Sequence, residues 1–389
     1  MFTLFEKASR VNKEEWASIT NHETTFLEID FLKVLESIEN TNLLSRYVVV
    51  YQNQIPCGVI YFQIVDFKAE VFGSILADKV ETIKSAKVHL FEKYIDVHKN
   101  GTILRLFTCG NNLVSGDYGF KFSNTLSQEC QLELVLKITE VIAKEEKLSR
   151  TISAILIKDF EQPLQPNDLI KKEKYIQFFV EPNLVVDLPE NITGIEEYIH
   201  LFSKKYRNRA KSIFKKGSAI TQQLLNLSDI ERLEEDIYTL YDNIYQRAKF
   251  KLIKLPKHYF SDVKKLYPEH FVMKGFFLEG KLVAFNSCFT LHNNVLEAHY
   301  IGLDYRLNTQ YELYQNILYC MISIAIEHKK QKVNLGRTAA EIKTTVGAKP
   351  QDLTCYLKPQ NTLSKIIQKP FVNFLKPGEW VARNPFKEE

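Results

Sequence analysis

"VNLGRTAAEIKTTVGAKPQDL", residues 333–353, begins with a short apolar segment that runs directly into a glycine and a cation. Val333–Leu335 has the composition of a buried strand, and Gly336 can end it because glycine tolerates backbone conformations that other residues avoid. Arg337 and Lys343 follow just beyond the strand. Ligands of open α/β sheets bind at the carboxyl ends of the strands. This stretch therefore predicts an anion-binding loop at the end of a strand.

The order of elements around this stretch occurs twice in the chain. Each half shows strand-like runs with turn residues between them, then a helical pattern of apolar residues, then one more strand. In the first half these are residues 46–67, 102–110, 130–147 and 151–157, and in the second half 272–303, 311–328 and 332–336. The chain is thus predicted to use one α/β unit twice.

The length of 389 residues exceeds one comfortable hydrophobic core, which agrees with two domains. A segment rich in proline and charge, "QPLQPNDLIKKEK", separates the halves. The expected domains are residues 1–165 and 180–360. Residues 361–389 form a C-terminal arm that mixes apolar and basic residues. This arm is expected to pack on the domain, with contact to a membrane surface or a lipid-linked substrate as the alternative.

Composition excludes several classes of protein. A hydrophobic fraction of 45%, a charged fraction of 25% and a net charge of +4 are typical of a soluble globular protein and too weakly basic for a dedicated nucleic-acid binder. No apolar stretch is long enough for a signal peptide or a membrane span, so a cytoplasmic protein is expected. The six cysteines show no CxxC pair and no metal-ligand spacing. They are interpreted as buried free thiols, and no metal is expected.

A basic helix is predicted over residues 195–216, where apolar residues recur at helical spacing. Its other face carries seven cations and no carboxylate between residues 204 and 216. A solvated helix face usually mixes both charges, and an anion-binding surface is the competing interpretation. The candidate anion contacts are Lys204, Lys205, Arg207, Arg209 and Lys211. The anion could be phosphate, pyrophosphate or a tRNA backbone.

Candidate groups for acid–base chemistry lie on the strand "VLEAHYIG" of the second half. Strand alternation places Leu296, Ala298 and Tyr300 on one face and Glu297 and His299 on the other. A carboxylate or imidazole that faces a cleft could accept the proton of an amine nucleophile. A satisfied, partly buried Glu–His pair is the alternative. Asp304 and Tyr305, at the end of the strand, are further candidates for substrate binding.

Arg337 and Lys343 suit anion chemistry in different ways. Arg337 can bind a phosphate or carboxylate through two parallel N–H bonds, whereas Lys343 offers a point charge to a phosphate or a developing oxyanion. Both are expected on an irregular surface segment, and ordinary surface ion pairs are the alternative. Gly336 and Thr338, beside these two cations, are expected to contact the substrate.

Three segments together resemble the FemAB-like branch of the GNAT acyltransferases, a bacterial group. They are the basic stretch "LFSKKYRNRAKSIFKKG", the run that ends in "YIGLDYRLNTQYELYQNILYCMISIAI", and "NLGRTAAEIKTTVGAKP". The resemblance is sharpest over residues 195–358. It implies two tandem GNAT-like domains, each with a mixed, mainly antiparallel sheet flanked by helices. It also implies transfer of an acyl or aminoacyl group to an amine.

The chain departs from the glycine-rich pyrophosphate loop of ordinary acetyl-CoA enzymes, because "YRLNTQY" stands at the equivalent place of the second half. A helix N-terminus near Thr309, helped by Arg306, could still hold an anion.

The leading hypothesis is an acyltransferase that moves an acyl group from acyl-CoA or an acyl carrier protein to an amine, on a small molecule or a cell-envelope precursor, by direct attack. The donor would be a cosubstrate and not a tightly bound cofactor. Two alternatives are an aminoacyl-tRNA-dependent aminoacyltransferase of the peptidoglycan type and a non-catalytic GNAT-like binding module.

Overall fold

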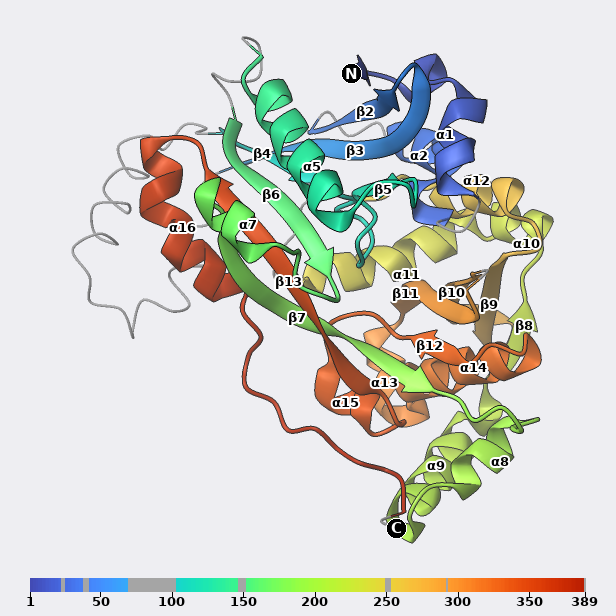
Figure 1. Ribbon diagram of the computed structural model, residues 1–389. Coiled ribbons are helices and arrows are strands. Elements are labelled where there is room, and N and C mark those ends of the chain that lie inside the picture. The colour runs from blue at the N-terminus through green and yellow to red at the C-terminus, as the bar shows by residue number, and fades with distance from the viewer. Residues whose placement is uncertain are drawn as a thin grey trace. The chain divides into compact units, whose positions relative to one another are not determined.

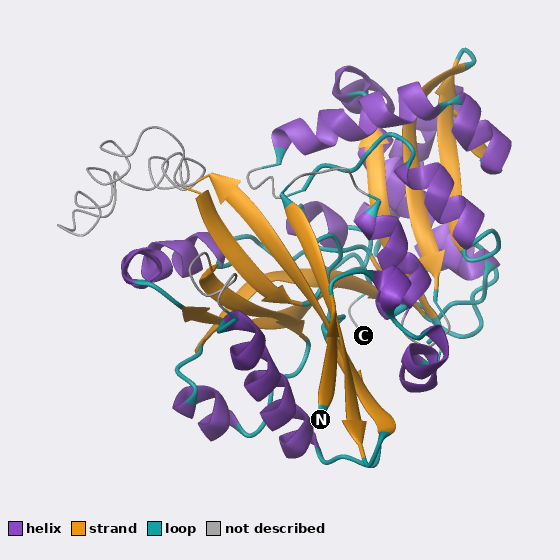
Figure 2. Ribbon diagram, turned by 90° about the horizontal axis from the view of Figure 1, so that it is seen from above, coloured by secondary structure: helices purple, strands orange, loops and turns teal. Residues whose placement is uncertain are grey.

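The computed structural model describes residues 1–21, 25–37, 42–68, 103–145, 152–248, 253–291 and 293–387. The chain divides into two compact units. Unit 1 comprises residues 1–181, 249–254 and 352–377, and unit 2 comprises residues 182–248, 255–351 and 378–389. Both units are α/β structures in which helices flank strands (Figures 1 and 2).

The elements of unit 1 come mainly from the first half of the chain. They are β1 (Phe2–Phe5), α1 (Lys13–Thr20), α2 (Ile29–Glu36), β2 (Leu43–Gln52), β3 (Ile55–Lys68), β4 (Ile103–Cys109), β5 (Phe120–Phe122), α5 (Gln128–Ala143), β6 (Ile152–Phe160), α7 (Asn167–Lys172) and α16 (Thr362–Leu375). Its sheet runs β1-β2-β3-β4-β6, and every neighbouring pair is antiparallel except β4 and β6.

The elements of unit 2 come from the second half. They are α8 (Ile195–His200), α9 (Lys204–Lys216), β8 (Thr221–Leu224), α10 (Leu227–Arg232), α11 (Glu234–Arg247), α12 (Tyr259–Leu266), β9 (Phe271–Leu278), β10 (Lys281–Thr290), β11 (Val295–Leu303), α13 (Tyr305–Tyr311), α14 (Leu313–Glu327), β12 (Lys332–Asn334) and α15 (Ala340–Thr344).

Two long strands carry the chain between the units. The boundary after residue 181 falls inside β7 (Ile176–Asp187), and the boundary after residue 351 falls inside β13 (Lys349–Pro359). The units therefore differ from the continuous ranges 1–165 and 180–360 expected from the sequence. The predicted arm, 361–389, is divided as well, with α16 in unit 1 and residues 378–389 in unit 2.

The sheet of unit 2 runs β7-β12-β11-β10-β9-β8. Only β11 and β12 form a parallel pair among these described strands, and the rest are antiparallel. The hairpin of β9 and β10 turns at Glu279 and Gly280, which both have positive φ angles of 51° and 81°. Such a two-residue turn matches the twist of the strands it joins. The mixed, mainly antiparallel sheet predicted from the sequence is confirmed.

Neighbouring residues of the central strands pack on opposite faces of the sheet. Ala284 and Cys288 contact the core shared with α8, α9 and α14. Phe285 and Phe289 belong instead to an aromatic cluster with residues of α12 and β11. This alternation is the period of two that a strand imposes, and since both faces are covered, β10 is buried from Leu282 to Thr290.

One helix prediction was wrong because a continuous apolar stripe hides a break in the backbone. The predicted helix 195–216 is two helices, α8 and α9. Phe202 between them is fully buried, and Ser203 has an extended backbone that starts α9 as its N-cap.

The second break separates α13 from α14 at Glu312, whose φ is +50°. Helix N-termini near these breaks are capped by side chains: Asp304 accepts from the Arg306 N–H, and Asn308 accepts from the Tyr314 N–H. The helix predicted over 311–328 is confirmed as α14, which starts after the break. The helix N-terminus expected near Thr309 is not there, because Thr309 lies inside α13.

Unit 1 repeats the strand–helix–strand order of unit 2. Helix α5 packs Leu132, Val135 and Ile142 against the sheet. Phe371 and Val372 of α16 are buried with Phe178 and Leu353, so this part of the predicted arm packs on the unit. Residues 146–151, at the end of the predicted helix and the start of the next predicted strand, lie outside the described residues, as does Thr102. Five of the six cysteines are buried, and all are free.

No helix in the described ranges combines the length and the apolar character that crossing a membrane requires.

Candidate functional site

Strands β11 and β12 separate after a short parallel ladder. Their three pairs end with Glu297 beside Asn334. β11 continues to Leu303, whereas the chain after β12 stays with β7, because the Leu335 N–H donates to the Leu184 carbonyl at 2.8 Å. Beyond Glu297, the side of β11 that faced β12 has no strand partner among the described strands. Backbone polar groups require partners, so this split can bind an extended ligand.

A chain of hydrogen bonds lies at the point where the strands separate. Asn334 Nδ2 donates to Glu297 Oε1 at 2.9 Å, and Asn334 Oδ1 accepts the Gly336 N–H at 2.9 Å. Glu297 and Asn334 are both buried. Asn334 thus fixes the carboxylate of Glu297 and the first residue of the following loop relative to each other.

The loop after β12 has an unusual backbone. Gly336, Thr338 and Ala339 have φ angles of +72°, +65° and +50°. This conformation suits glycine and is strained for the other two residues, and such strain is found preferentially at functional sites. Arg337 in this loop is half-buried, and Thr338 is exposed.

Lys343 lies inside the protein and not on a surface segment. It belongs to α15, its residue is 4% exposed, and its ammonium donates to the Gly336 carbonyl at 3.0 Å and to the Arg337 carbonyl at 2.5 Å. The expectation that Lys343 stands on an irregular exposed segment was therefore wrong. The side chain reaches back from a helix and holds the strained loop, which places a fixed positive charge beside the split.

The residues just after β11 pair with one another or with Arg247. Arg306 pairs with Asp304 at 2.6 Å, and this pairing lowers the pKa of the Asp304 carboxyl. The ring of Tyr305 lies 3.7 Å below the guanidinium of Arg247, and burial raises the pKa of the Tyr305 hydroxyl. Asp304, Tyr305 and Arg306 thus form a charged rim where β11 ends.

A bulge in β11 changes the predicted alternation. Ala298 pairs with Cys288 and Ile301 with Asn286, so His299 and Tyr300 together face Ser287. Both side chains therefore turn to the aromatic face, and the prediction that Tyr300 shares a face with Leu296 and Ala298 was wrong.

His299 and Glu297 have different partners. His299 Nε2 lies 2.7 Å from the hydroxyl of Tyr259 and its ring stacks on the Tyr259 ring. Burial lowers the pKa of His299 to about 3, so the imidazole is neutral at physiological pH. Glu297 instead contacts Asn334 at the split, as described above.

The cations of the predicted basic helix lie on α9 and mostly face solvent. Arg207 donates to the Phe202 carbonyl, Arg209 to Gln315, and Lys216 to Glu312. The ammonium of Lys205 lies 5.6 Å from the centre of the Tyr206 ring. Lys204, Lys211 and Lys215 are exposed and form no ion pair within the described part of the chain.

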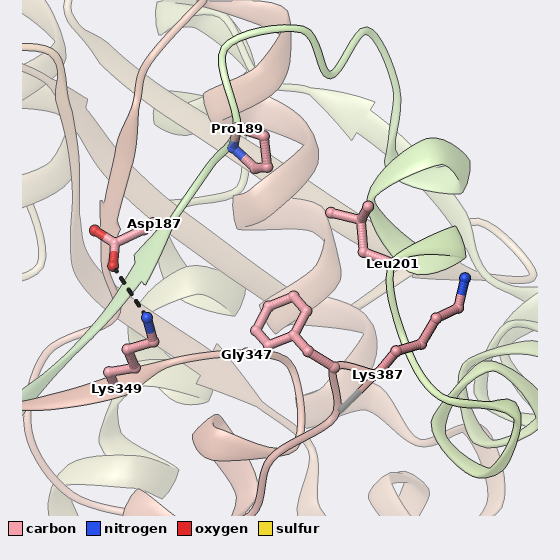
Figure 3. A pocket seen from close by; sticks show the side chains of 7 residues that line it. Asp187, Pro189, Leu201, Gly347, Lys349 and Lys387 are labelled. Atoms are coloured by element: carbon pink, nitrogen blue, oxygen red, sulfur yellow. Dashed lines mark ion pairs between the residues drawn. The ribbon is translucent and has the colours of Figure 1, made fainter. Parts of the chain in front are cut away.

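A separate pocket of about 410 Å³ lies beside α8 (Figure 3). An ion pair of 3.8 Å between Asp187 and Lys349 closes one side, and Lys387 stands at the other. None of the predicted site residues lines it. The lining residues are Asp187, Pro189, Leu201, Gly347, Lys349, Phe386 and Lys387.

No protein-family model and no curated protein matches this sequence. Solved structures do match in fold. FemX, 11% identical, matches over 94% of this chain and 99% of its own, with a TM-score of 0.53. A tandem GNAT protein of the clavulanic acid biosynthesis pathway, solved without AcCoA, is 6% identical and matches over 93% of this chain and 99% of its own, with a TM-score of 0.52.

A conserved protein of unknown function from Bacteroides thetaiotaomicron is 10% identical and matches over 92% of this chain and 99% of its own, with a TM-score of 0.50.

The chain has a FemAB-like, tandem GNAT fold. This confirms the fold class predicted from the sequence. Identities of 6% and 11% establish the fold alone, and a fold does not determine the chemistry.

The structure brings Glu297, Gly336, Arg337 and Lys343 together at one split, and it adds Asn334, which sequence reasoning missed. A polar residue inside the apolar segment Val333–Leu335 was the available signal. His299 lies in the aromatic cluster, and the α9 cations form a separate surface.

We expect Lys343→Met to destabilise the protein. The variant leaves the Arg337 carbonyl without the ammonium donor, whereas the Gly336 carbonyl keeps the Leu184 N–H. A buried unsatisfied group costs about 1 to 3 kcal/mol. The free energy of unfolding, measured by urea denaturation, should fall by an amount in that range. Lys349→Met, at a side chain that is 72% exposed, is the control and should change it little. An unchanged unfolding midpoint for Lys343→Met would show that the two bonds do not stabilise the loop.

We expect His299 to make stability depend on pH. Its pKa is about 3 in the folded protein and about 6.5 when unfolded, so between these values the unfolded chain binds a proton that the folded chain does not. The contribution of neutral His299 to the free energy of unfolding should therefore be complete above about pH 6.5. Below that pH, the free energy of unfolding should fall by up to about 1.4 kcal/mol per pH unit.

Urea denaturation at pH 5, 6 and 7 checks this expectation. His299→Gln keeps a polar partner for Tyr259 but cannot titrate, so its pH slope should be shallower than that of the parent. His200→Gln, at an exposed position, should keep the parental slope. Equal slopes for the parent and His299→Gln would mean that His299 titrates normally in the folded protein.

Proposed function

We propose that unit 2 transfers an acyl group from a thioester or ester donor, acyl-CoA or an acyl carrier protein, to an amine by direct attack. The observation that carries this proposal is the split between β11 and β12, which opens after Glu297 and Asn334. An extended arm that contains amide groups can add along the free edge of β11 as an additional strand would. Acyl-CoA and acyl carrier proteins both carry such an arm.

A comparison of the two units supports unit 2 as the site of transfer. The corresponding parallel pair in unit 1, β4 and β6, stays together up to Cys109, the last residue of β4. In unit 2 the ladder ends at Glu297, well before β11 ends at Leu303. Among the described residues of unit 1, β4 therefore has no equivalent free edge for a donor.

The residues around the split suit the steps of the reaction. The amine nitrogen attacks the donor carbonyl, a C–N bond forms, and the carbonyl oxygen becomes an oxyanion. Backbone N–H groups of the split and the nearby charge of Lys343 stabilise this oxyanion. The intermediate then expels the thiolate or alkoxide of the donor.

Glu297 accepts the proton that the attacking amine loses. Its carboxylate is oriented by Asn334 at the separation point of the strands. His299 is a weaker candidate for this role, since burial lowers its pKa to about 3 and Tyr259 occupies its Nε2. Arg337 and the left-handed loop beside it supply contacts for the anionic part of the donor.

Glu297→Gln tests the proposal. The amide keeps the shape and the bond to Asn334 but cannot accept a proton, so turnover should fall by about a hundred- to ten-thousandfold. Binding of acetyl-CoA, measured by calorimetry, should be nearly unchanged. Glu269→Gln, at an exposed position of the same unit, is the matched control for loss of one carboxylate.

Normal turnover by Glu297→Gln would remove the assigned base and leave the donor site in place. Failure of the parent protein to bind acetyl-CoA, longer acyl-CoA or an acylated carrier protein would contradict the donor class. Donor binding without transfer to any amine would favour a non-catalytic binding module.

A second candidate function uses aminoacyl-tRNA as the donor. The observation in its favour is the exposed face of α9, where Lys204, Lys211 and Lys215 have no ion pair within the described residues. Unpaired, exposed lysines on one helix provide sites for backbone phosphates.

Replacing Lys204, Lys211 and Lys215 together with glutamine tests this candidate. Each lost phosphate contact lowers the slope of log K against log salt by about 0.7 to 0.9, so the slope should fall by about 2 to 3 for tRNA. A triple variant at the exposed Lys171, Lys172 and Lys174 of unit 1 has the same change in charge and should keep the parental slope. The tRNA candidate is excluded when the two triple variants show the same salt dependence.

A further inference from the structure

The C-terminal strap, residues 378–387, extends across unit 2 from α15 to the break between α8 and α9 (Figure 1). At α15, the Arg383 N–H donates to Thr344 Oγ1 at 3.0 Å, and the Arg383 guanidinium pairs with Glu341. At the helix break, the Ser203 N–H donates to the Pro385 carbonyl at 2.8 Å. The strap therefore joins two parts of the unit that are far apart in sequence.

Phe386 anchors the strap. Its ring centre lies 5.4 Å from that of Phe202 and 6.2 Å from that of Tyr198, both in edge-on contacts. Tyr198 in turn donates to the Val346 carbonyl at 2.8 Å. A Cβ at Gly347 would lie 2.8 Å from the Phe386 ring, so the absence of a side chain there permits this close packing.

Helix α15 depends on such contacts. It spans Ala340–Thr344 alone, and a helix this short is not stable without tertiary packing. It also carries Lys343, whose ammonium holds the carbonyls of Gly336 and Arg337. The strap thus contacts α15 directly, and Lys343 of α15 contacts the strained loop.

We propose that the C-terminal strap positions the acyl-transfer site by holding α15, Lys343 and the loop of Gly336–Ala339 in the reactive arrangement. Phe386 and Arg383 are then positioning residues, which act through α15 and touch neither donor nor acceptor. The effect on turnover rests on the proposed function of unit 2, whereas the effect on the loop does not.

Phe386→Ala is the test variant, and Val381→Ala, at a strap residue that is 59% exposed, is the matched control. Hydrogen exchange read by mass spectrometry over residues 336–346 should become about tenfold faster in Phe386→Ala and stay parental in Val381→Ala. Turnover at saturating donor should fall by about ten- to a hundredfold, because small displacements of reacting groups are this costly. Phe386→Leu should recover part of both losses.

Arg383→Ala keeps the test decisive if Phe386→Ala does not fold, since it removes a partly exposed ion pair and leaves the Phe386 packing intact. Parental exchange over residues 336–346 in the variants that fold would overturn the proposal, as would faster exchange with parental turnover. If the parent transfers no acyl group from any donor, the proposed function fails, while the exchange measurement still decides whether the strap holds the loop.

Discussion

The last pair of the parallel ladder, Glu297 beside Asn334, is the constraint on which the proposed site depends. Up to this pair, β12 shares its hydrogen bonds between β11 and β7, and beyond it the chain follows β7 alone. The hydrogen bond from Asn334 to Glu297 then marks the vertex of the split. A carboxylate, a free strand edge and a loop with left-handed residues meet there because two strands separate at that residue pair.

A buried lysine makes the strained loop possible. Moving an ammonium out of water is unfavourable unless hydrogen bonds replace its hydration, and the carbonyls of Gly336 and Arg337 provide such bonds to Lys343. The same bonds hold the carbonyls of Gly336 and Arg337 in place, in a loop where Thr338 and Ala339 have unfavourable positive φ angles. One side chain thus offsets backbone strain and supplies positive charge, and an apolar residue of equal size could do neither.

The sequence predicted the strands of unit 2 closely, since alternation and turn residues are local signals; β9, β10 and β11 lie within residues 271–303, where strand runs were predicted over 272–303. It failed at Phe202, where the apolar helical stripe continues through a break that only tertiary packing imposes. The helix predicted over 311–328 formed, but the sequence missed the break at Glu312 that precedes it. The face of Tyr300 was missed because a bulge depends on the partner strand. The segment 333–353 identified Lys343 as a candidate site residue, but its burial depends on the position of α15 and could not be predicted from that segment.

Both units fix a loop with a buried lysine, but the lysine comes from a different element in each. In unit 1, Lys158 belongs to the strand β6, pairs with the fully buried Asp159, and donates to the Asn111 and Val114 carbonyls at 2.8 and 2.9 Å. This ties the segment after β4 to the neighbouring strand, and the ladder stays closed. In unit 2, Lys343 reaches back from a helix to the loop after β12, so it fixes the loop without bridging β11 and β12. The lysine thus comes from a strand in the unit whose parallel pair stays together and from a helix in the unit whose parallel pair separates, although the order of elements is the same.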